Sequence, residues 1–453
     1  MHFLRLGIAG MRGEVGSGLT PLLAINYAAA LGTWIDGGSV VVGTDTRNSS
    51  PMFYSAVVSA LLGCGCQVYD AGICPAPLLH FLVPHLHADA GILIGAGHHP
   101  ANWNALVALG GNGAYLNAIQ VQELLDIYHS GEYRYCEGDR LGRVSPIPDT
   151  AADSYLDQLL APIEVSSIVE AGYTVIADFC NGSGSIMAAK LASRLGLNLI
   201  SLNDTLSGIL PHDPEPRPRS STQVQSIMAP LHAAIGFVFN SDMSRIAVVT
   251  DDGETLSEEY SFPLAAQHIL SRLPSGQTVV TNPCSTRTLD DVAARYGAEV
   301  IKTKVGQAFI VDAMLENHAV LGGDGSGSVV MANGVGGYDS FLVMVLLLEA
   351  MAVHKTRVSE LVAALPRYHL QKRKFTCPAA NAYKLLRHLK TAFPDARITE
   401  EDGTRFDWRD GWVHLRCSAT EPVIRMIVEW RTREEAEDRA MQVQGILERL
   451  VSA

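Results

Sequence analysis

No apolar run in the sequence is long enough to cross a bilayer. The longest, at residues 341–348, ends at Glu349 and fits a buried core helix. The first 16 residues are too short and too often interrupted by glycine to form the apolar centre of a signal peptide. These absences predict a cytoplasmic protein that has no membrane partner.

Zinc-binding cysteine pairs and an excess of positive charge are also absent. The eight cysteines include Cys64 and Cys66, but no Cys or His pair has zinc-finger spacing, so we expect buried, reduced thiols. The formal net charge is −13, which disfavours nucleic acid or anionic lipid as a partner. A few local arginines still allow a site for an anionic ligand.

The chain has 453 residues, of which 47% are hydrophobic and 18% charged, as is typical of folded domains. At about 150 residues per domain, this length predicts three or four domains. Short β-rich runs alternate with helical patterns: a strand at 40–43, a helix at 50–63 and a strand at 67–69. The same order recurs at 172–195 and 278–296, which indicates parallel sheets with crossover helices.

The C-terminal stretch differs in kind. Two helical segments accompany strand patterns at 412–416 and 425–430, which predicts an α+β domain. Polar turns and prolines near 146–150, 250–254 and 364–368 suggest where domains meet. We therefore expect an α/β protein with three mixed or parallel α/β domains, at 1–150, 151–256 and 257–366, followed by an α+β domain at 367–453.

Six loops carry most of the glycines and polar groups that could form a site. They lie at residues 7–13, 43–50, 95–100, 240–245, 322–328 and 416–425. Loops at the carboxyl ends of parallel strands often bind ligands. Any one of the six is explained equally well as a turn in which glycine supplies the geometry and Asp or Ser caps the backbone.

The last of these loops has the most informative chemistry. Arg416, Ser418, Thr420 and Arg425 place two guanidinium groups and two hydroxyls within ten residues. Arginine suits bidentate binding of phosphate oxygens, so the pattern predicts a phosphate-binding loop. The alternative is a turn with a surface ion pair between an arginine and Glu421.

In order and spacing, over essentially the whole chain, the six loops resemble the α-D-phosphohexomutase family, which includes phosphoglucosamine mutase and phosphomannomutase/phosphoglucomutase. The resemblance implies four domains around one central cleft and a phosphoserine in a T-A-S-H-N-P loop. It also implies a magnesium ion held by three Asp of a D-G-D-x-D-R loop, a G-E-x-S-G-H loop for sugar hydroxyls and an R-x-S-G-T-E-P loop for the substrate phosphate.

The match at 416–422, R-C-S-A-T-E-P, is the strongest, and residues 10–13, 45–50 and 303–306 support it. The resemblance implies a phosphorylated hexose or amino sugar as ligand. The substrate-binding residues that it implies are Arg12, Arg47, Arg245, Asp324, Ser326, Arg416, Ser418, Thr420 and Arg425.

The departures from the family pattern fall on the catalytic groups. The phosphoserine position is Gly97, which has no hydroxyl to carry a phosphate. The three metal-binding positions are Asn240, Asp242 and Ser244, and one carboxylate of three makes a poor magnesium site. Magnesium is therefore the only cofactor to consider, at a degenerate site.

Three further positions depart from the pattern. The N-G-x-K motif reads N-A-L-V at 104–107, so its lysine is lost. The histidine of the sugar loop is Ser328, and its glutamate is the shorter Asp324. Catalytic groups are lost while binding groups remain, which predicts a phosphosugar-binding pseudoenzyme acting as a sensor or partner subunit.

Two other interpretations stay open. His98 and His99 lie where phosphoryl transfer normally starts, and either could be phosphorylated or act as a general base. With Asp242 they could also form a two-histidine, one-carboxylate metal site. Against this, adjacent histidines on an extended segment point in opposite directions, and His98 could be a supporting residue of the family motif.

A still-active mutase is the other alternative. The sequence leaves open a protein partner or a homo-oligomer.

Overall fold

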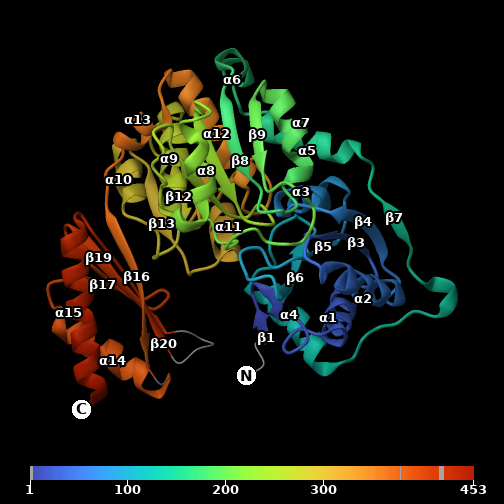
Figure 1. Ribbon diagram of the computed structural model, residues 1–453. Helices are drawn as coiled ribbons and strands as arrows, with labels where there is room; N and C mark the ends of the chain where they lie inside the picture. The colour runs from blue at the N-terminus through green and yellow to red at the C-terminus, as the bar shows by residue number, and fades with distance from the viewer. Residues whose placement is uncertain (1–3, 378, 418–422, 453) are drawn as a thin grey trace.

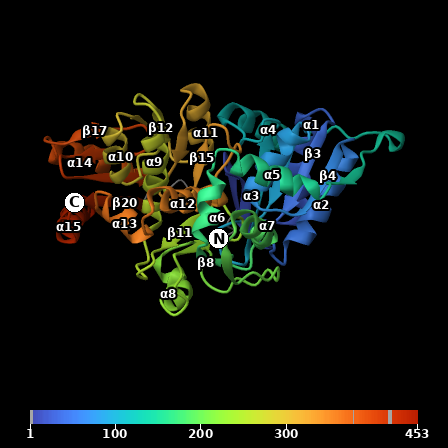
Figure 2. The same cartoon turned by 90° about the horizontal axis from the view of Figure 1, so that it is seen from above.

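A computed structural model describes the chain except residues 1–3, 378, 418–422 and 453, and without the side chains of residues 379–383 and 450–452. The strands of the described residues form four separate sheets, one in each of four domains. Figures 1 and 2 show the N-terminal domain (blue) at one end of the molecule and the C-terminal domain (red) at the other, with the green and yellow domains between them.

The first domain contains a seven-stranded mixed sheet in the order β1-β2-β6-β5-β3-β4-β7. Its elements are β1 (Leu4–Gly7), β2 (Gly10–Glu14), α1 (Pro21–Trp34), β3 (Ser39–Thr44), α2 (Ser50–Gly63), β4 (Gln67–Ile73), α3 (Ala76–His85), β5 (Ala90–Ile94), β6 (Trp103–Gly110), α4 (Ala118–Ser130), the 3-10 turn η1 (Gly138–Arg140) and β7 (Val144–Pro146). β3 is parallel to β4 and β5, and the three valines Val40, Val41 and Val42 are fully buried at its centre. Such a run is typical of a strand covered on both faces.

The second domain has the sheet order β11-β10-β8-β9, in which only β11 is antiparallel to its neighbour. Its elements are α5 (Thr150–Leu160), α6 (Val165–Ala171), β8 (Thr174–Asp178), α7 (Ser185–Leu195), β9 (Asn198–Leu202), η2 (Pro218–Ser221), α8 (Thr222–Met228), β10 (Ile235–Phe239) and β11 (Ile246–Val249). The β10–β11 turn at 240–245 therefore lies at the carboxyl end of a buried parallel strand.

The third domain repeats this plan with the order β13-β12-β14-β15. Its elements are η3 (Glu258–Tyr260), α9 (Ser261–Arg272), β12 (Thr278–Thr281), α10 (Thr288–Arg295), β13 (Glu299–Lys302), α11 (Gln307–Glu316), β14 (Leu321–Gly323), β15 (Val329–Met331), α12 (Ser340–His354) and α13 (Val358–Ala363). Helix α12 contains the long apolar run and is buried from Ser340 to Ala352, which confirms the predicted core helix. Its packing against α5, α6 and α9 joins the second and third domains into one core.

The C-terminal domain is an antiparallel sheet, in the order β16-β20-β19-β18-β17, packed against two helices. Its elements are β16 (His369–Thr376), α14 (Ala379–Ala392), β17 (Arg397–Thr399), β18 (Thr404–Asp407), β19 (Gly411–Cys417), β20 (Val423–Trp430) and α15 (Arg433–Ser452). This agrees with the predicted α+β character. The fold is thus the predicted one, three mixed α/β domains and one α+β domain.

Two expectations from composition can be compared with the structure. All eight cysteines are free thiols; Cys136, Cys284 and Cys417 are half-exposed and the other five are buried. Within the described part of the chain, no helix is both long and apolar enough to span a membrane.

Candidate phosphosugar site

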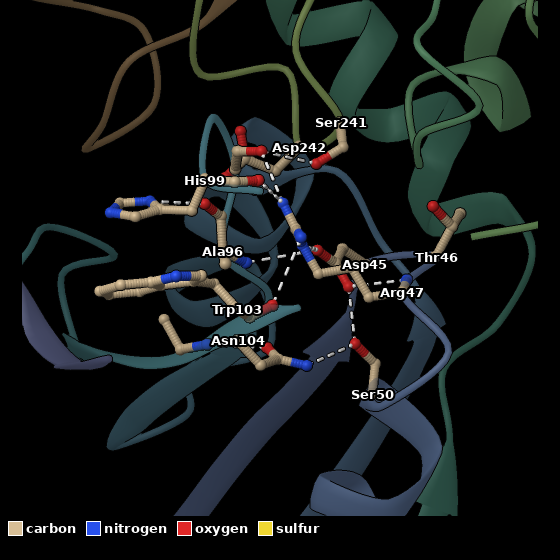
Figure 3. Close-up of polar contacts among 12 residues, drawn as sticks. Asp45, Thr46, Arg47, Ser50, Ala96, His99, Trp103, Asn104, Ser241 and Asp242 are labelled. Carbon is tan, nitrogen blue, oxygen red and sulfur yellow. Dashed lines mark hydrogen bonds and ion pairs between the residues drawn. The ribbon is translucent and has the colours of Figure 1, made fainter. Parts of the chain in front are cut away.

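The loop at 95–100 is fixed by a buried arginine from the neighbouring loop. Arg47, only 2% exposed, donates from Nε to Asp45 Oδ2 at 2.9 Å. Its two terminal nitrogens donate to the carbonyl oxygens of Gly97 (3.0 Å), His99 (2.6 Å), Pro100 (2.7 Å) and Trp103 (3.3 Å). These five acceptors use every N–H of the guanidinium. Figure 3 shows Arg47 among Asp45, His99 and Trp103.

Arg47 is among the residues predicted to bind substrate, but in this structure its side chain holds the 95–100 loop. The residue has no donor left for a ligand, and it does not line the cavity described below. Ser50 strengthens the same cluster by donating to Asp45 Oδ1 at 2.6 Å, and the buried Asn104 donates to Ser50 Oγ at 3.1 Å. Together these contacts hold the backbone that would carry the reacting group.

Gly97 occupies a conformation and a space that oppose a side chain. Its φ is +50°, in the left-handed region that favours glycine. A Cβ at this position would lie 2.6 Å from Asp242 Oδ2 and 3.3 Å from Asn240 Nδ2. Ser241 Oγ donates to the Gly97 carbonyl at 3.0 Å, so the loop at 240–245 packs directly on this turn.

The loop at 240–245 satisfies its own polar groups. Asn240 Nδ2 donates to Asp242 Oδ1 at 2.8 Å and to Ser244 Oγ at 3.0 Å. The amide orientation is fixed because Asn240 Oδ1 accepts from the Arg245 N–H at 3.1 Å. Ser244 Oγ also donates to Asp242 Oδ1, at 2.6 Å.

This arrangement does not fit magnesium. Mg²⁺ requires several hard oxygen ligands in near-octahedral geometry, and here the Asn240 amide nitrogen contacts both Asp242 Oδ1 and Ser244 Oγ. The described residues contain no group of three His, Cys, Asp or Glu side chains placed to hold a metal. The alternative site made of His98, His99 and Asp242 is therefore not formed.

His98 and His99 do not point in opposite directions as expected for an extended segment. Residues 96–99 form a turn in which the His99 N–H donates to the Ala96 carbonyl, and the two imidazole centroids lie 4.4 Å apart. His99 also stacks on Trp103, with 5.1 Å between ring centroids. Burial, and then the nearby Arg12, lower the pKa of His99 to about 4, and burial and Arg245 lower the pKa of His98.

We expect the imidazole of His99 to titrate near pH 4 rather than near 6.5. Because the folded-state pKa is depressed, the unfolded chain binds the proton more readily between these values, so stability falls as the pH falls through this window. A His99→Gln variant should lose less stability between pH 7 and pH 4.5 than the wild type. NMR titration of the imidazole and unfolding at both pH values measure this; titration near 6.5 would contradict it.

A cavity of about 270 Å³ opens between the second, third and fourth domains. Five of the nine predicted substrate-binding residues line it: Arg245, Asp324, Ser326, Arg416 and Arg425. Arg12 is half-buried and does not line it. Ser418 and Thr420 lie outside the described residues.

The C-terminal domain presents its arginines from adjacent strands. Arg416 on β19 and Arg425 on β20 are direct partners in the antiparallel register, and Lys374 on β16 is the partner of Arg425 on the other side. Arg416 is oriented by Asp402, whose Oδ1 accepts from Nε at 2.8 Å. This row of cations suits an anionic group such as phosphate.

A second group of cations approaches from the first two domains. Burial lowers the pKa of Arg12, and the charges of Arg5, Arg245 and Arg425 add to this effect. Arg245 is paired with Glu215, which offsets part of the charge. Mutual repulsion among these guanidinium groups would be relieved by an anion bound between them.

The loop at 322–328 supplies the groups suited to hydroxyls. Asp324 Oδ1 accepts from the Ser326 N–H at 2.9 Å, and its Oδ2 accepts from Asn282 Nδ2 at 3.2 Å. Ser326 Oγ is buried and has no partner among the described residues. Ser328 faces away: its Oγ shares a hydrogen bond of 2.7 Å with Ser340 Oγ at the start of α12.

Family models of the phosphoglucomutase/phosphomannomutase domains match all four parts of the chain. Domain I (alpha/beta/alpha) matches residues 4–135, domain II 153–253, domain III 257–368 and the C-terminal domain 373–446. A protein of Thermococcus gammatolerans named "Probable phosphoglucosamine mutase" is 32% identical over 452 residues, covering 98% of this chain and 97% of its own. The chain belongs to the phosphohexomutase family.

Two further relatives agree with this assignment. A "Phosphoglucomutase/phosphomannomutase" of Thermococcus kodakarensis is 30% identical, over 95% of this chain and 96% of its own. The crystal structure of a phosphoglucomutase/phosphomannomutase family protein from Burkholderia thailandensis superposes with a TM-score of 0.84 at 25% identity, covering 98% of this chain and 96% of that one.

Several residues that line the cavity were not predicted from the sequence. They are Glu215, Arg217, Glu258, Glu259, Asn282, Cys284, Val305, Gly325, Lys372, His414 and Ile427. Glu258 and Glu259 begin a helical segment, where acidic residues are common for electrostatic reasons, so the sequence carried no distinguishing signal. Lys372 and His414 come from central positions of strands, where a side chain can face either side of the sheet.

Proposed function

We propose that this member of the phosphohexomutase family binds a phosphorylated hexose or amino sugar in the cavity between the second, third and fourth domains. We also propose that it does not carry phosphate on residue 97. It would then act as a sensor or as a partner subunit. The main support is the pairing of Arg416 with Arg425 on adjacent strands, lining the same cavity as Asp324 and Ser326. Guanidinium groups suit the phosphate, and a carboxylate with a hydroxyl suits the sugar.

The loops at 95–100 and 240–245 support the negative part of this proposal. Gly97 offers no nucleophile, and the groups around Asp242 are already hydrogen-bonded to one another. Both are features of this chain's own side chains, independent of any bound ion.

An active phosphohexomutase is the second candidate, and the comparisons by themselves favour it. Relatives about 32% identical over nearly the whole chain are named phosphoglucosamine mutases. This candidate requires a different phosphate carrier, and His98 and His99 are the nucleophilic side chains nearest to Gly97 in sequence. Turnover assays separate the two candidates.

Replacing Arg425 by alanine should weaken phosphosugar binding by roughly ten- to hundredfold, because one charge-assisted hydrogen-bonding group to the phosphate is lost. Calorimetry at fixed ionic strength with glucose 6-phosphate and glucosamine 6-phosphate measures the effect. Arg433→Ala removes the same charge from the exposed start of α15 and serves as the control. The proposal fails if neither ligand binds the wild type below millimolar concentration, or if the two variants bind equally.

A further inference from the structure

A second carboxylate lies beside the sugar loop, and the predicted site does not account for it. Glu259, in the short helix η3, has a side chain only 4% exposed, and it lines the same cavity as Asp324 and Ser326. One oxygen, Oε1, lies 2.9 Å from Lys372 Nζ. The other, Oε2, is buried and has no hydrogen-bond partner among the described residues. A buried acceptor without a hydrogen bond destabilises the folded protein, unless a bound ligand donates a hydrogen bond to it.

The position of this carboxylate depends on Gly325. A Cβ at residue 325 would lie 2.3 Å from both carboxylate oxygens of Glu259 and 2.4 Å from its Cδ. Any larger residue would displace the Glu259 side chain from the loop. Asp324 is shorter than the glutamate of the family motif, and the glycine that follows it leaves room for the longer Glu259 side chain from η3.

The charges at this end of the cavity do not balance. Lys372 Nζ also lies 3.1 Å from Glu258 Oε1, so one ammonium serves two carboxylates, and Asp324 adds a third on the cavity wall. The carboxylate of Asp324 accepts from the side-chain amide of Asn282 and from the Ser326 N–H, both of which are uncharged donors. Burial raises the pKa of Glu259 to about 7, despite the opposing effect of Lys372.

A ligand group that carries positive charge and N–H donors would relieve this imbalance. A sugar hydroxyl can donate one hydrogen bond, whereas an ammonium group donates three and carries the compensating charge. Arg416 and Arg425 of the C-terminal domain line the same cavity and remain available to bind the phosphate. One phosphorylated amino sugar therefore carries both kinds of charge that the cavity complements.

We propose that Glu259, admitted by Gly325, determines specificity by binding the amino group of a phosphorylated amino sugar; this inference rests on the proposed phosphosugar-binding function. The competing explanation is that Glu259 only holds the third domain against the fourth, through its ion pair with Lys372. A tie of that kind would affect every ligand equally, whereas amine recognition affects only ligands that have the amino group.

The test compares glucosamine 6-phosphate with glucose 6-phosphate by calorimetry at pH 7.5 and fixed ionic strength. We expect the wild type to prefer the amino sugar by about tenfold, the size of one charge-assisted interaction. Glu259→Gln and Gly325→Ala should each reduce this ratio towards one. Lys372→Arg keeps a positive charge beside Glu259 and should keep the preference for the amino sugar.

Each outcome decides a separate point. Wild type that binds both sugars equally overturns the role of Glu259 and leaves the proposed function standing, whatever the variants do. A loss shared equally by both sugars in Glu259→Gln also overturns it, in favour of the interdomain tie. Wild type that binds neither sugar phosphate overturns the proposed function and this inference together.

Discussion

The purified protein should not interconvert glucose 1-phosphate and glucose 6-phosphate, or the glucosamine phosphates, even with magnesium and a sugar 1,6-bisphosphate. Gly97 has no hydroxyl to pass a phosphoryl group to the sugar. One oxygen of the remaining carboxylate of the 240–245 loop, Asp242 Oδ1, accepts hydrogen bonds from Asn240 and Ser244. A nucleophile and its electrostatic support act as a unit, so losing both removes many orders of magnitude in rate. Turnover above about 1 s⁻¹ would support the mutase candidate instead.

Rescue experiments separate the two losses. Gly97→Ser alone should stay inactive, because the loop at 240–245 would still lack two of the three metal-binding carboxylates. Adding Asn240→Asp and Ser244→Asp should allow the bisphosphate to phosphorylate the new serine, detected as a phosphate adduct by intact mass spectrometry. The same two Asp changes with Gly97→Ala give the matched control without a hydroxyl. Robust mutase activity from Gly97→Ser alone would show that the interpretation of the 240–245 loop is wrong.

The sequence predicts the elements well wherever local patterns decide them. Helix α2 spans Ser50–Gly63 and helix α7 Ser185–Leu195, as expected, because each lies between polar or glycine-rich turns. The apolar run beginning at Phe341 could only be a buried helix. Such patterns depend on residues close in the chain, so they can be interpreted without knowledge of tertiary contacts.

The site was predicted less completely because its partners are distant in sequence. Arg47 looked like a ligand-binding arginine, yet its backbone acceptors lie 50 to 56 residues away. The orientation of His98 and His99 depends on the positive φ of Gly97, which the sequence permits but does not require. Glu259 enters the cavity only because residue 325 is glycine. Each case is a non-local contact.

Replacing Arg47 by alanine should destabilise the first domain by about 3–5 kcal/mol, because the Asp45 carboxylate would stay buried without its partner. The side chains of Arg47 and Asp45 are 1% and 0% exposed. Four backbone carbonyls between residues 97 and 103 would lose their donor as well. We therefore expect a lower thermal unfolding temperature and faster hydrogen exchange in the peptide spanning residues 96–103.

An exposed ion pair of the same domain gives the control for this change. Arg134 and Asp36 have side chains 72% and 76% exposed, so Arg134→Ala should cost less than about 1 kcal/mol. Arg47→Lys keeps the charge but cannot reproduce five donors in a planar fork, so its stability should lie between wild type and Arg47→Ala. If Arg47→Ala is as stable as Arg134→Ala, the arginine does not hold the loop. If it instead keeps wild-type stability but loses phosphosugar binding as Arg425→Ala does, Arg47 belongs to the ligand site after all.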